Sequence, residues 1–363
     1  MLNMTYGYAI DRRAIDPLVT LIEKMLRNFS AATVPLAWFV DAIPQLAQLP
    51  DWFPGTNFKR TARVWKNLNF DVANIPYDFV RKRMARGNYQ ASYTSDILQS
   101  INESPEQTLT LEQEEDIKWS AASLYSGGTD TIVGSLESFF LAMIMYPDVQ
   151  KQAQDEIDRV TGGTRLPCLA DRESLPYISR IVSETFRWNP VGPMGLAHVA
   201  EEDIPLEEYT IPKGAYLLPA VWWFCHDPER YSEPDKFDPS RYCEPRNEPD
   251  LKAYTFGFGK RSCPGRVFAE SEIFLIIAQT LAVLQIRAGV NEDGTKDRPT
   301  LKPMPGLISH PLEFKYEISP RSASHAKLVH ELKAEEPHAY GDTAWLDIAN
   351  RDWTEGKERR RHV

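Results

Sequence analysis

The sequence predicts a mainly α-helical fold with a minor β component. Apolar residues at helical spacing, three and four positions apart, recur from near the start of the chain to about residue 188. Short stretches of β-branched and aromatic residues, broken by Pro and Gly, are confined to about 195–320. With 363 residues, the chain is long enough for one large domain or two ordinary ones, with a sizeable core.

The composition is that of a globular protein. Apolar residues make up 42% and charged residues 25%, which argues against disorder, collagen-like repeats or a disulfide scaffold over most of the chain. The net charge of −10 argues against general nucleic-acid binding, which needs a basic face to meet phosphates. No cysteine lies in a C-x-x-C pair, so neither a zinc ribbon nor a redox dithiol is indicated; the cysteines are Cys168, Cys225, Cys243 and Cys263.

Helices dominate the first 110 residues. The apolar spacing predicts a helix over 14–31, and further helices over about 57–86 and 92–102. Pro76 would kink or split the second of these, because proline lacks the N–H group that a helix interior needs. Residues 103–110 are polar and predict a linker.

The longest helical signal covers about 111–145. Thr110 is a candidate cap, and acidic side chains follow it in the first turn, where the helix dipole favours them. Residues 148–160 are helical again. The helix predicted over 175–188 ends at Asn189-Pro190, because the residue before a proline avoids helical backbone.

Beyond residue 190 the pattern changes. Residues 198–200, 209–211 and 215–220 predict short strands, and 226–262 predicts a long loop. An apolar helix follows over 264–285.

The end of the chain divides into two parts. Short β pieces at 297–318 complete a domain expected to cover 1–320. Residues 321–363 predict a polar, disordered tail that ends in Lys-Glu-Arg-Arg-Arg-His-Val. A short basic run of this kind is usually solvated surface, so it does not indicate nucleic-acid binding.

No transmembrane segment is predicted. The most apolar runs, 139–146 and 273–286, are shorter than the ~20 residues that cross a bilayer. The N-terminus lacks the pattern of a signal peptide. Trp52 and Phe53, within the loop 46–58, suit either a membrane interface or packing on the core, and the sequence leaves both open.

A cysteine with unusual surroundings lies in the stretch 256–265, Phe-Gly-Phe-Gly-Lys-Arg-Ser-Cys-Pro-Gly. Cys263 comes directly before the apolar helix, near the positive end of its dipole and two residues from Arg261, and both favour the metal-binding thiolate. Pro264 suits the first helical turn, and the glycines let the backbone turn tightly around the sulfur. A lone cysteine before a helix is more often structural, but the spacing here favours a ligand.

Phe256, Gly259, Arg261, Cys263 and Gly265 match all five fixed positions of F-x-x-G-x-R-x-C-x-G, so the chain resembles the cytochrome P-450 family of haem-thiolate monooxygenases. The resemblance implies the cytochrome P-450 fold, haem b as cofactor, and Cys263 as the axial ligand of the haem iron. It also implies that Phe256 packs near the sulfur and that Arg261 pairs with a haem propionate. A thiolate ligand pushes electron density onto the iron and favours O–O cleavage.

A second match is Glu184-Thr-Phe-Arg187, which resembles the family's E-x-x-R motif. The spacing puts both charges on one helix face, and by itself would indicate only an ordinary surface ion pair. Arg241 resembles the arginine that completes a Glu-Arg-Arg cluster in the family. A guanidinium can bridge two partners, which suits locking a loop onto a helix, so these three residues are expected to be structural.

A third match lies in the long helix, at Ser126-Gly-Gly-Thr-Asp130-Thr131. Two adjacent glycines inside a helix cost about 1 kcal/mol each, and indicate either close helix packing or a local distortion that meets a ligand. The family places an acid–alcohol pair here. The resemblance implies that Asp130 feeds protons and that Thr131 orders the water that carries them to dioxygen. Ile132 stands where family members often carry a second hydroxyl residue.

Other residues are assigned from the resemblance alone. His198 falls where related fungal-type members place a His or Arg that contacts a haem propionate, although a lone histidine is more often structural. Residues Val191 to Leu196 and Gly306 to Ser309 resemble loops that line the substrate pocket, and the long helix is expected to contribute Trp119, Ala122 and Ser123.

The resemblance covers about 5–318, whereas family members normally have considerably more sequence before the cysteine. Residues 1–110 contain Trp38, Trp52 and Trp65 with no arginine four positions after any of them, so the family's W-x-x-x-R motif is missing. The sequence therefore predicts an N-terminally shortened form of the fold, with a complete cysteine side and an incomplete haem enclosure.

The resemblance implies a monooxygenase that inserts one oxygen atom from O2 into a small apolar substrate, in fungal secondary metabolism. Its electrons would come from NADPH through cytochrome P-450 reductase. Two alternatives stay open, a catalytically impaired fragment or scaffold of the same fold, and a haem-thiolate isomerase or dehydratase, which the Asp130-Thr131 pair disfavours. The expected location is the cytoplasm, with 46–58 as the point of any peripheral contact with the endoplasmic reticulum.

Overall fold

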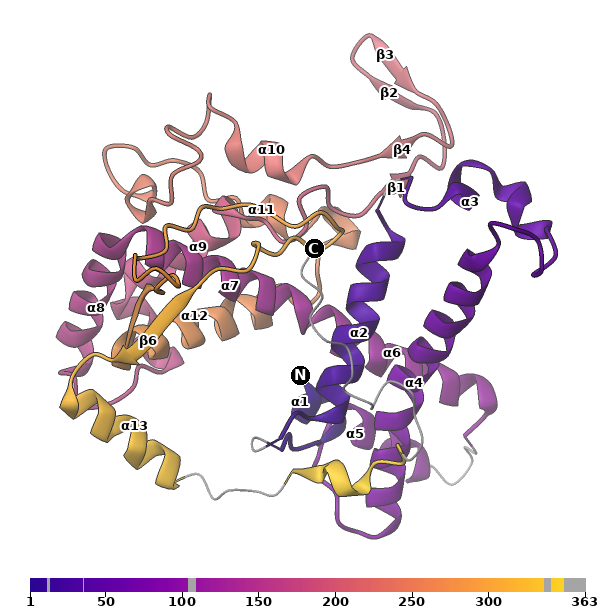
Figure 1. The fold of residues 1–363 in the computed structure, drawn as a ribbon, viewed down its shortest axis with the longest axis horizontal. Coiled ribbons are helices and arrows are strands. Elements are labelled where there is room, and N and C mark those ends of the chain that lie inside the picture. The colour runs from indigo at the N-terminus through magenta and orange to yellow at the C-terminus, as the bar shows by residue number, and fades with distance from the viewer. Residues whose placement is uncertain (12–13, 35, 104–108, 336–340, 349–363) are drawn as a thin grey trace. The chain divides into compact units, whose positions relative to one another are not determined.

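A computed structural model describes residues 1–11, 14–34, 36–103, 109–335 and 341–348 (Figure 1). The chain forms two compact units, the first Met1–Asp130 with Pro337–Val363 and the second Thr131–Glu336. The domain expected over 1–320 is therefore divided between them. The expected tail contributes a helix to the second unit and residues 341–348 to the first.

Helices build the first unit, and capping residues set where they begin. The Asp16 carboxylate accepts the N–H of Leu18 at the start of its helix, and Ser92 and Thr110 both form capping boxes. The elements are α1 Leu2–Tyr6, α2 Pro17–Ala32, α3 Phe39–Ala42, η1 Pro44–Gln48, α4 Asn57–Ala85, α5 Tyr93–Asn102, α6 Leu111–Gly127 and η5 Asp342–Trp345.

Helix α4 runs without a break through Pro76, so of the kink or split expected there, the split is wrong. A proline in a helix interior costs roughly 3 kcal/mol. Pro76 is buried, and so are Val72 and Ile75 before it and Phe79 after it. This burial of apolar surface on both sides of the proline outweighs the lost hydrogen bond and keeps the helix continuous.

The core of the first unit gathers apolar side chains from α1, α2, α4, α5 and α6. Tyr6 and Tyr125 meet edge to face with ring centroids 6.0 Å apart. The loop 46–58 lies apart from this core. Trp52 is 81% exposed and Phe53 is 42% exposed, so of the two uses left open for these aromatics, packing in the core is excluded.

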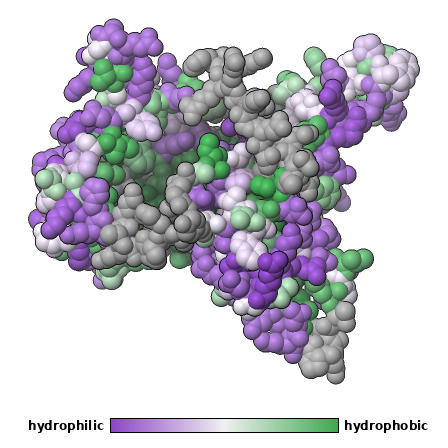
Figure 2. Space-filling model, turned by 60° about the horizontal axis from the view of Figure 1, so that its bottom comes forward, coloured by the Kyte–Doolittle hydropathy of each residue, from purple (hydrophilic) through white to green (hydrophobic). Residues whose placement is uncertain are grey.

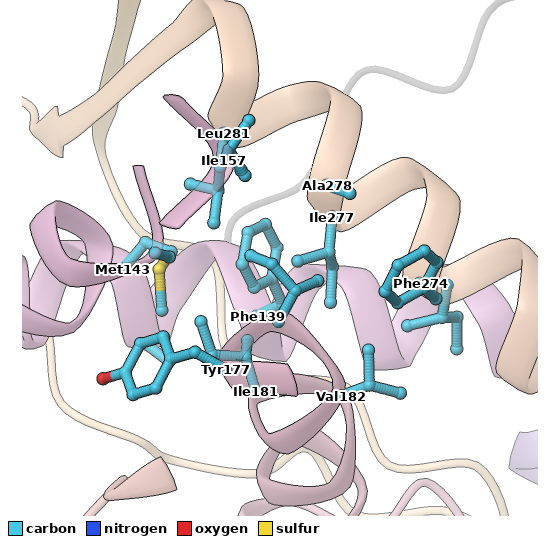
Figure 3. Packing of buried hydrophobic residues seen from close by; sticks show 14 of the residues in the cluster. Phe139, Met143, Ile157, Tyr177, Ile181, Val182, Phe274, Ile277, Ala278 and Leu281 are labelled. Atoms are coloured by element: carbon cyan, nitrogen blue, oxygen red, sulfur yellow. The ribbon is translucent and has the colours of Figure 1, made fainter. Parts of the chain in front are cut away.

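The second unit packs four helices around one apolar core (Figure 3). Phe139 of α7, Ile157 of α8, Ile181 of α9 and Ile277 of α12 meet in it, each fully buried. The helices and turns of this part are α7 Asp130–Met145, α8 Pro147–Thr161, η2 Leu169–Ser174, α9 Pro176–Trp188, α10 Val221–His226, η3 Pro239–Tyr242, α11 Lys252–Thr255, η4 Gly259–Arg261, α12 Arg266–Val283 and α13 Ala323–Glu335.

The β structure of the described residues consists of three two-stranded antiparallel sheets, all within the span where strands were expected. Strand β1 (His198–Val199) pairs with β4 (Tyr216–Leu217), and β2 (Ile204–Leu206) with β3 (Tyr209–Ile211). Strand β5 (Leu284–Ala288) follows α12 directly and pairs with β6 (Tyr316–Pro320), with Ile286 opposite Ile318. The mainly α fold with a minor β component is thus confirmed.

The segment expected to be a tail begins with helix α13, so the structure differs from the expectation there. Its Leu328 and Val329 pack against the core of the second unit, and this apolar pair explains why the segment is not simply solvated. Residues 336–340 and 349–363 of the expected tail lie outside the described residues.

Figure 2 shows a surface on which hydrophilic side chains predominate and hydrophobic ones gather in separate patches. Within the described ranges, no single helix combines the length and apolarity needed to span a bilayer. Residues 111–145 and 147–161 pass that test only together, as a pair bent by 104°.

Candidate functional site

Residues 256–265, here named the Cys loop, form a tight turn between α11 and α12. The N–H of Cys263 donates to the carbonyl of Phe256 at 2.7 Å, which closes the loop. Gly257 and Gly259 have φ values of +79° and +52°, a backbone region that side-chain-bearing residues rarely adopt. The loop therefore depends on glycine at these two positions.

The Cys263 side chain is exposed and forms no disulfide. It lies just before α12, but this helix begins at Arg266 with Gly265 as its N-cap, two residues later than expected. Pro264 is thus outside the first helical turn. The thiol still lies at the N-terminal end of α12, and it is accessible to a ligand.

Phe256 fixes the start of the Cys loop to α9. Its ring meets that of Phe186 edge to face, with centroids 5.1 Å apart. The guanidinium of Arg266 lies 5.8 Å from the Phe256 ring centroid on another side. That Phe256 packs near the sulfur of Cys263 stays a prediction.

A hollow in the second unit lies beside Phe256 and contains about 350 Å³ of empty space, open solvent included. Helix α7 contributes Thr131 to it, and Ala269 of α12 lies on its wall. Thr131 of the acid–alcohol pair and Phe256 of the Cys loop, which are far apart in the sequence, therefore line one hollow. Its lining residues are Thr131, Ile132, Ser135, Phe186, Pro190, Val191, Thr255, Phe256, Ala269 and Ile273.

The residues present fit a haem better than a bare metal ion. Among the described residues, no group of three or more His, Cys, Asp or Glu side chains could hold a metal by itself. A haem brings its own nitrogen ligands and needs one axial ligand from the protein. The exposed Cys263 thiol, in the same loop as Phe256 of the mostly apolar hollow, matches that need.

The α6–α7 junction contains the expected local distortion. Helix α6 ends at Gly127 and α7 begins at Asp130, with a turn between them. The Thr129 hydroxyl donates to the carbonyl of Tyr125 at 2.6 Å. A Cβ atom on Gly128 would lie 2.6 Å from the Met1 side chain, so close packing and local distortion both occur here.

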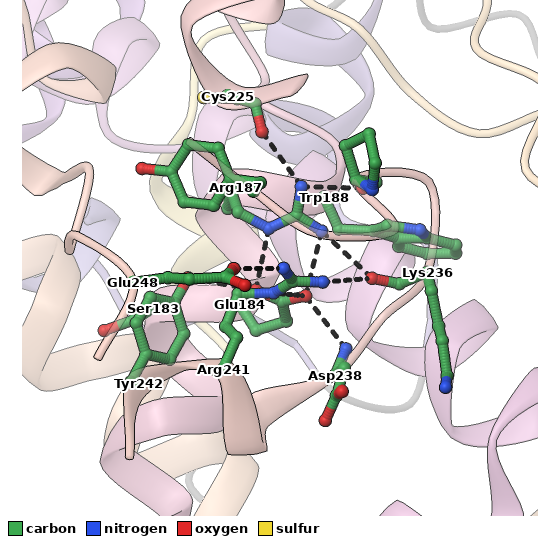
Figure 4. Close-up of polar contacts among 12 residues, drawn as sticks. Ser183, Glu184, Arg187, Trp188, Cys225, Lys236, Asp238, Arg241, Tyr242 and Glu248 are labelled. Atoms are coloured by element: carbon green, nitrogen blue, oxygen red, sulfur yellow. Dashed lines mark hydrogen bonds and ion pairs between the residues drawn. The ribbon is translucent and has the colours of Figure 1, made fainter. Parts of the chain in front are cut away.

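Glu184 lies at the centre of a buried ionic cluster (Figure 4). Its Oε2 accepts from Nε of Arg187 at 2.8 Å, and its Oε1 accepts from Nη2 of Arg187 and from Nε of Arg241, both at 2.9 Å. All three side chains are fully buried. The three residues expected to form a cluster do meet, and we call them the Glu-Arg-Arg cluster.

The cluster also holds the loop 225–248 in place. Arg187 donates to the carbonyls of Cys225 at 2.9 Å and Pro234 at 2.7 Å. Arg241 donates to the carbonyls of Ser232 at 3.1 Å and Lys236 at 2.9 Å. These bonds satisfy both guanidinium groups, which is what burial of a charge requires.

Sequence reasoning missed three further members. The Tyr242 hydroxyl donates to Glu184 at 2.9 Å, and so does the N–H of Asp238. Glu248 pairs with Arg241. Burial alone would raise the pKa of Glu248, but hydrogen bonds from Arg241 and Arg246 hold this pKa below its ordinary value. Tyr242 follows Arg241 directly, which was a usable signal; Glu248 carried none.

Burial, together with the charge of Glu184, raises the pKa of Tyr242 well above its ordinary value. The phenol therefore stays protonated and remains a donor to the carboxylate at any ordinary pH.

Arg261 and His198 lie outside the lining of the hollow. Both side chains are exposed, Arg261 at the end of η4 and His198 on β1 opposite Leu217. In the described part of the chain, neither side chain has a hydrogen-bond or ion-pair partner. Their assignment to propionates stays a prediction.

Of the expected pocket loops, Val191 lines the hollow, whereas 192–196 and 306–309 are absent from its lining. Ser309 still reaches this wall, because its N–H donates to the carbonyl of Val191 at 2.8 Å. Trp119, Ala122 and Ser123 lie on α6, in the first unit.

The chain is similar in sequence to known fungal proteins. The chain is 45% identical over 93% of its length to a multifunctional cytochrome P450 monooxygenase of Aspergillus fumigatus, covering 63% of that protein. It is 44% identical over 95% of its length to a cytochrome P450 monooxygenase of Gibberella zeae, covering 66%. It is 36% identical over 94% of its length to O-methylsterigmatocystin oxidoreductase of Aspergillus flavus, covering 64%.

The chain thus spans somewhat less than two thirds of the length of these relatives. The sequence profile of the family described as Cytochrome P450 matches residues 12–318. That match covers most of the chain, including the Cys loop, the Glu-Arg-Arg cluster and the α6–α7 junction. The chain belongs to the cytochrome P450 family.

Proposed function

We propose that this chain is a haem-thiolate monooxygenase that inserts one atom of O2 into a small apolar substrate. Family membership implies a haem iron and electrons supplied by a reductase. That these electrons come from NADPH through cytochrome P450 reductase is part of the proposal. The observation that carries the proposal is the hollow, which is lined by both Thr131 of α7 and Phe256 of the Cys loop.

Cys263 would hold the haem iron, and Arg261 and His198 would pair with its propionates. The exposed, unbridged thiol of Cys263 supports the first role. Neither Arg261 nor His198 has an internal partner within the described residues, so both side chains are available for a ligand. When bound, a haem with a thiolate ligand supplies the redox chemistry that activates O2.

Asp130 and Thr131 would move protons in this scheme. They occupy the first turn of α7, directly after the α6–α7 break, and Thr131 reaches the hollow. Asp130 would take protons from solvent, and the Thr131 hydroxyl would hold the water that passes them to the reacting oxygen. Positioned proton transfer of this kind contributes strongly to rate.

An apolar substrate fits the lining of the hollow. Seven of its lining side chains carry no polar group, and those of Ile132, Val191 and Ile273 are branched aliphatic. Burial of apolar ligand surface against such a lining is favourable. The similarity to fungal enzymes that include O-methylsterigmatocystin oxidoreductase supports a product of fungal secondary metabolism as the substrate.

The first experiment is the carbon monoxide difference spectrum of the reduced, purified chain. Bound haem with a thiolate ligand is expected to give the strongly red-shifted Soret band of the family. Cys263→Ala should lose this band, and Cys168→Ser is the matched control because Cys168 is also exposed and unbridged. A red-shifted band that survives Cys263→Ala would refute the ligand assignment.

The alternative that the sequence leaves open is an impaired form that binds haem without turnover. Electrons from NADPH and reductase should be consumed with product formed if the chain is an active monooxygenase. A red-shifted band with no substrate-dependent NADPH consumption, across a panel of apolar substrates, would favour the impaired form.

We also propose peripheral membrane contact through 46–58, with the endoplasmic reticulum as the membrane. The high exposure of Trp52 supports it, because indole rings favour the lipid interface. Co-sedimentation with phosphatidylcholine vesicles should weaken in Trp52→Ala. Equal sedimentation of the two proteins would contradict this contact.

A further inference from the structure

Residues 341–348, here named the strap, pack on the N-terminal helices of the first unit. Trp345, Leu346 and Ile348 of the strap are partly buried against that core. A Cβ atom on Gly341 would lie 2.3 Å from the backbone nitrogen of Asp11. The strap can therefore approach the N-terminal segment this closely only because position 341 is glycine.

Hydrogen bonds join the strap to Tyr8 and Ala9. The N–H of Asp342 donates to the carbonyl of Ala9, and the N–H of Ala9 donates back to the Asp342 carboxylate, both at 2.9 Å. The hydroxyls of Thr343 and Tyr8 lie 3.2 Å apart. Tyr8 in turn donates to Asp16 at 2.8 Å. Asp16 caps α2, so the strap covers the network that starts this helix.

A stack of rings and cations continues from Tyr8 to the strap. The Tyr8 and Phe79 rings meet edge to face at 5.2 Å, and the Arg83 guanidinium lies 5.9 Å from the Phe79 centroid. Arg83 lies 4.8 Å from the centroid of Trp345, and Arg86 lies 4.7 Å from it. The Trp345 indole is thus contacted by two cations from the end of α4.

Trp345 also contacts a guanidinium that has one unsatisfied donor, that of Arg83. The Nε atom of Arg83 is buried and has no hydrogen-bond partner within the described residues. The other nitrogens of this guanidinium have acceptors in Asp342 and in the Asn88 amide oxygen. The face of the Trp345 ring adds a favourable contact with the charge, and tryptophan provides the strongest contact of this kind.

Acidic residues flank the tryptophan and face basic ones. Asp342 lies 3.6 Å from Arg83, and Asp347 lies 3.7 Å from Lys82. The strap thus presents Asp-Thr-Ala-Trp-Leu-Asp to a surface made by Ala9, Lys82, Arg83 and Arg86, which we call the α4 cradle. The charges are complementary on both sides of the indole, which fixes register as well as attraction.

We propose that the α4 cradle is a recognition surface for an acidic, tryptophan-centred peptide segment, and that its occupant is residues 341–348 of the same chain. Occupation of the cradle fastens Tyr8 and Ala9 onto α4 and keeps the Tyr8–Asp16 hydrogen bond formed. This interaction involves neither Cys263 nor the hollow, so it stands or falls independently of the monooxygenase proposal.

The first test is hydrogen exchange of the full chain, followed by mass spectrometry of the peptides that contain Ala9 and Asp342. Trp345→Ala should raise amide exchange in both peptides by about tenfold, because the substitution removes both cation–π contacts to the indole. Trp52→Ala is the matched control, since Trp52 is exposed and distant in sequence from both. Unchanged exchange around Ala9 in Trp345→Ala would overturn the proposal.

A second test asks whether the cradle recognises the segment itself. A fluorescein-labelled peptide of residues 341–348 should bind the full-length Trp345→Ala chain at least about tenfold more tightly than the wild type, whose cradle is occupied. Adding Arg86→Gln to Trp345→Ala should reduce this binding. Equal binding to all three chains, or to a peptide with alanine in place of tryptophan, would overturn the proposal.

Discussion

The Nε atom of Arg241 lies 2.9 Å from Oε1 of Glu184, although the two residues are 57 positions apart in the sequence. Both side chains are fully buried. This ion pair joins η3 to α9 and, through the carbonyls that Arg241 and Arg187 hold, keeps the loop 225–248 against the helix. Its value lies in the path that it imposes on this loop, because a buried ion pair by itself adds little net stability.

Breaking this pair should be costly. Arg241→Ala would leave the Glu184 carboxylate buried with too few donors, and the free energy of unfolding should fall by about 3–5 kcal/mol. Urea unfolding monitored by circular dichroism measures it. Glu229→Gln is the control, because Glu229 is exposed in the same loop, and it should change stability by less than about 0.5 kcal/mol. A similar loss in both variants would contradict the structural role.

The cysteines should differ sharply in reactivity. Burial raises the pKa of the Cys225 thiol to about 12, whereas Cys168 and Cys263 are exposed. Iodoacetamide at about pH 8, close to the pKa of a free thiol, should modify Cys168 and Cys263 and spare Cys225. Mass spectrometry of the digested protein identifies the sites.

Haem provides a further control for this labelling. If Cys263 holds the iron, loading with haem should protect Cys263 and leave Cys168 as reactive as before. Protection of both thiols, or of neither, would count against the assignment of Cys263.

Stability should depend on pH through His226. Burial lowers the pKa of His226, and the charge of Arg187 lowers it further, despite the hydrogen bond to the Trp222 carbonyl. The unfolded chain then binds a proton below about pH 6.5 that the folded chain does not. The free energy of unfolding should therefore fall as pH decreases below about 6.5, by at most about 1.4 kcal/mol per pH unit from this group.

Comparison of variants isolates the His226 contribution. His226→Gln should flatten the decline of stability between about pH 7 and 5, as measured by urea unfolding at a series of pH values. His330→Gln, at an exposed position of α13, should leave the slope unchanged. An unaltered slope in His226→Gln would show that other groups cause the decline.

The Thr131 hydroxyl should matter more for coupling than for binding. Thr131→Ala should lower product formed per NADPH consumed several-fold, because the water that carries the proton would lose its partner. Thr131→Ser keeps the hydroxyl and should restore most of the coupling. Product and NADPH are measured in the same reaction. Coupling that is equal in Thr131→Ala and wild type would argue against a proton role.

Local signals predicted the helices well. Apolar spacing and caps located α2, α5, α6 and α9, and the structure confirms Thr110 as a cap. The Cys loop could be recognised because its glycines, arginine and cysteine have fixed spacing over ten residues. Such features depend only on near neighbours in the chain, which is why sequence reasoning reaches them.

Long-range features were beyond that reach. The carbonyl partners of Arg187 and the pairing of Glu248 with Arg241 depend on the path of an irregular loop. The strap was missed because its polar composition resembles that of a solvated tail, and its fit is visible only against Arg83 and Arg86. The split expected at Pro76 failed because the burial around a proline cannot be judged from the residue alone.

Gly134 offers a test of how closely α7 is packed. It lies one turn after Thr131, and a Cβ atom there would lie 3.2 Å from the Ser309 carbonyl oxygen and 3.3 Å from Cγ1 of Val191. Ser309 and Val191 cannot move apart from each other to make room, because the N–H of Ser309 donates to the Val191 carbonyl at 2.8 Å. His310, a third neighbour, lies 2.8 Å from Glu137.

Two effects of Gly134→Ala therefore oppose each other. Alanine gains up to about 1 kcal/mol in helix propensity, while overpacking costs about 1–3 kcal/mol. A net loss of about 1 kcal/mol in the free energy of unfolding is expected from these principles. Gly127→Ala is the control, since a Cβ atom there would meet nothing within 4 Å, and it should be neutral or stabilising. Because Val191 lines the hollow, the strain of Gly134→Ala should also weaken binding of apolar ligands there. A Gly134→Ala chain as stable as Gly127→Ala would show that the wall around Val191 yields freely.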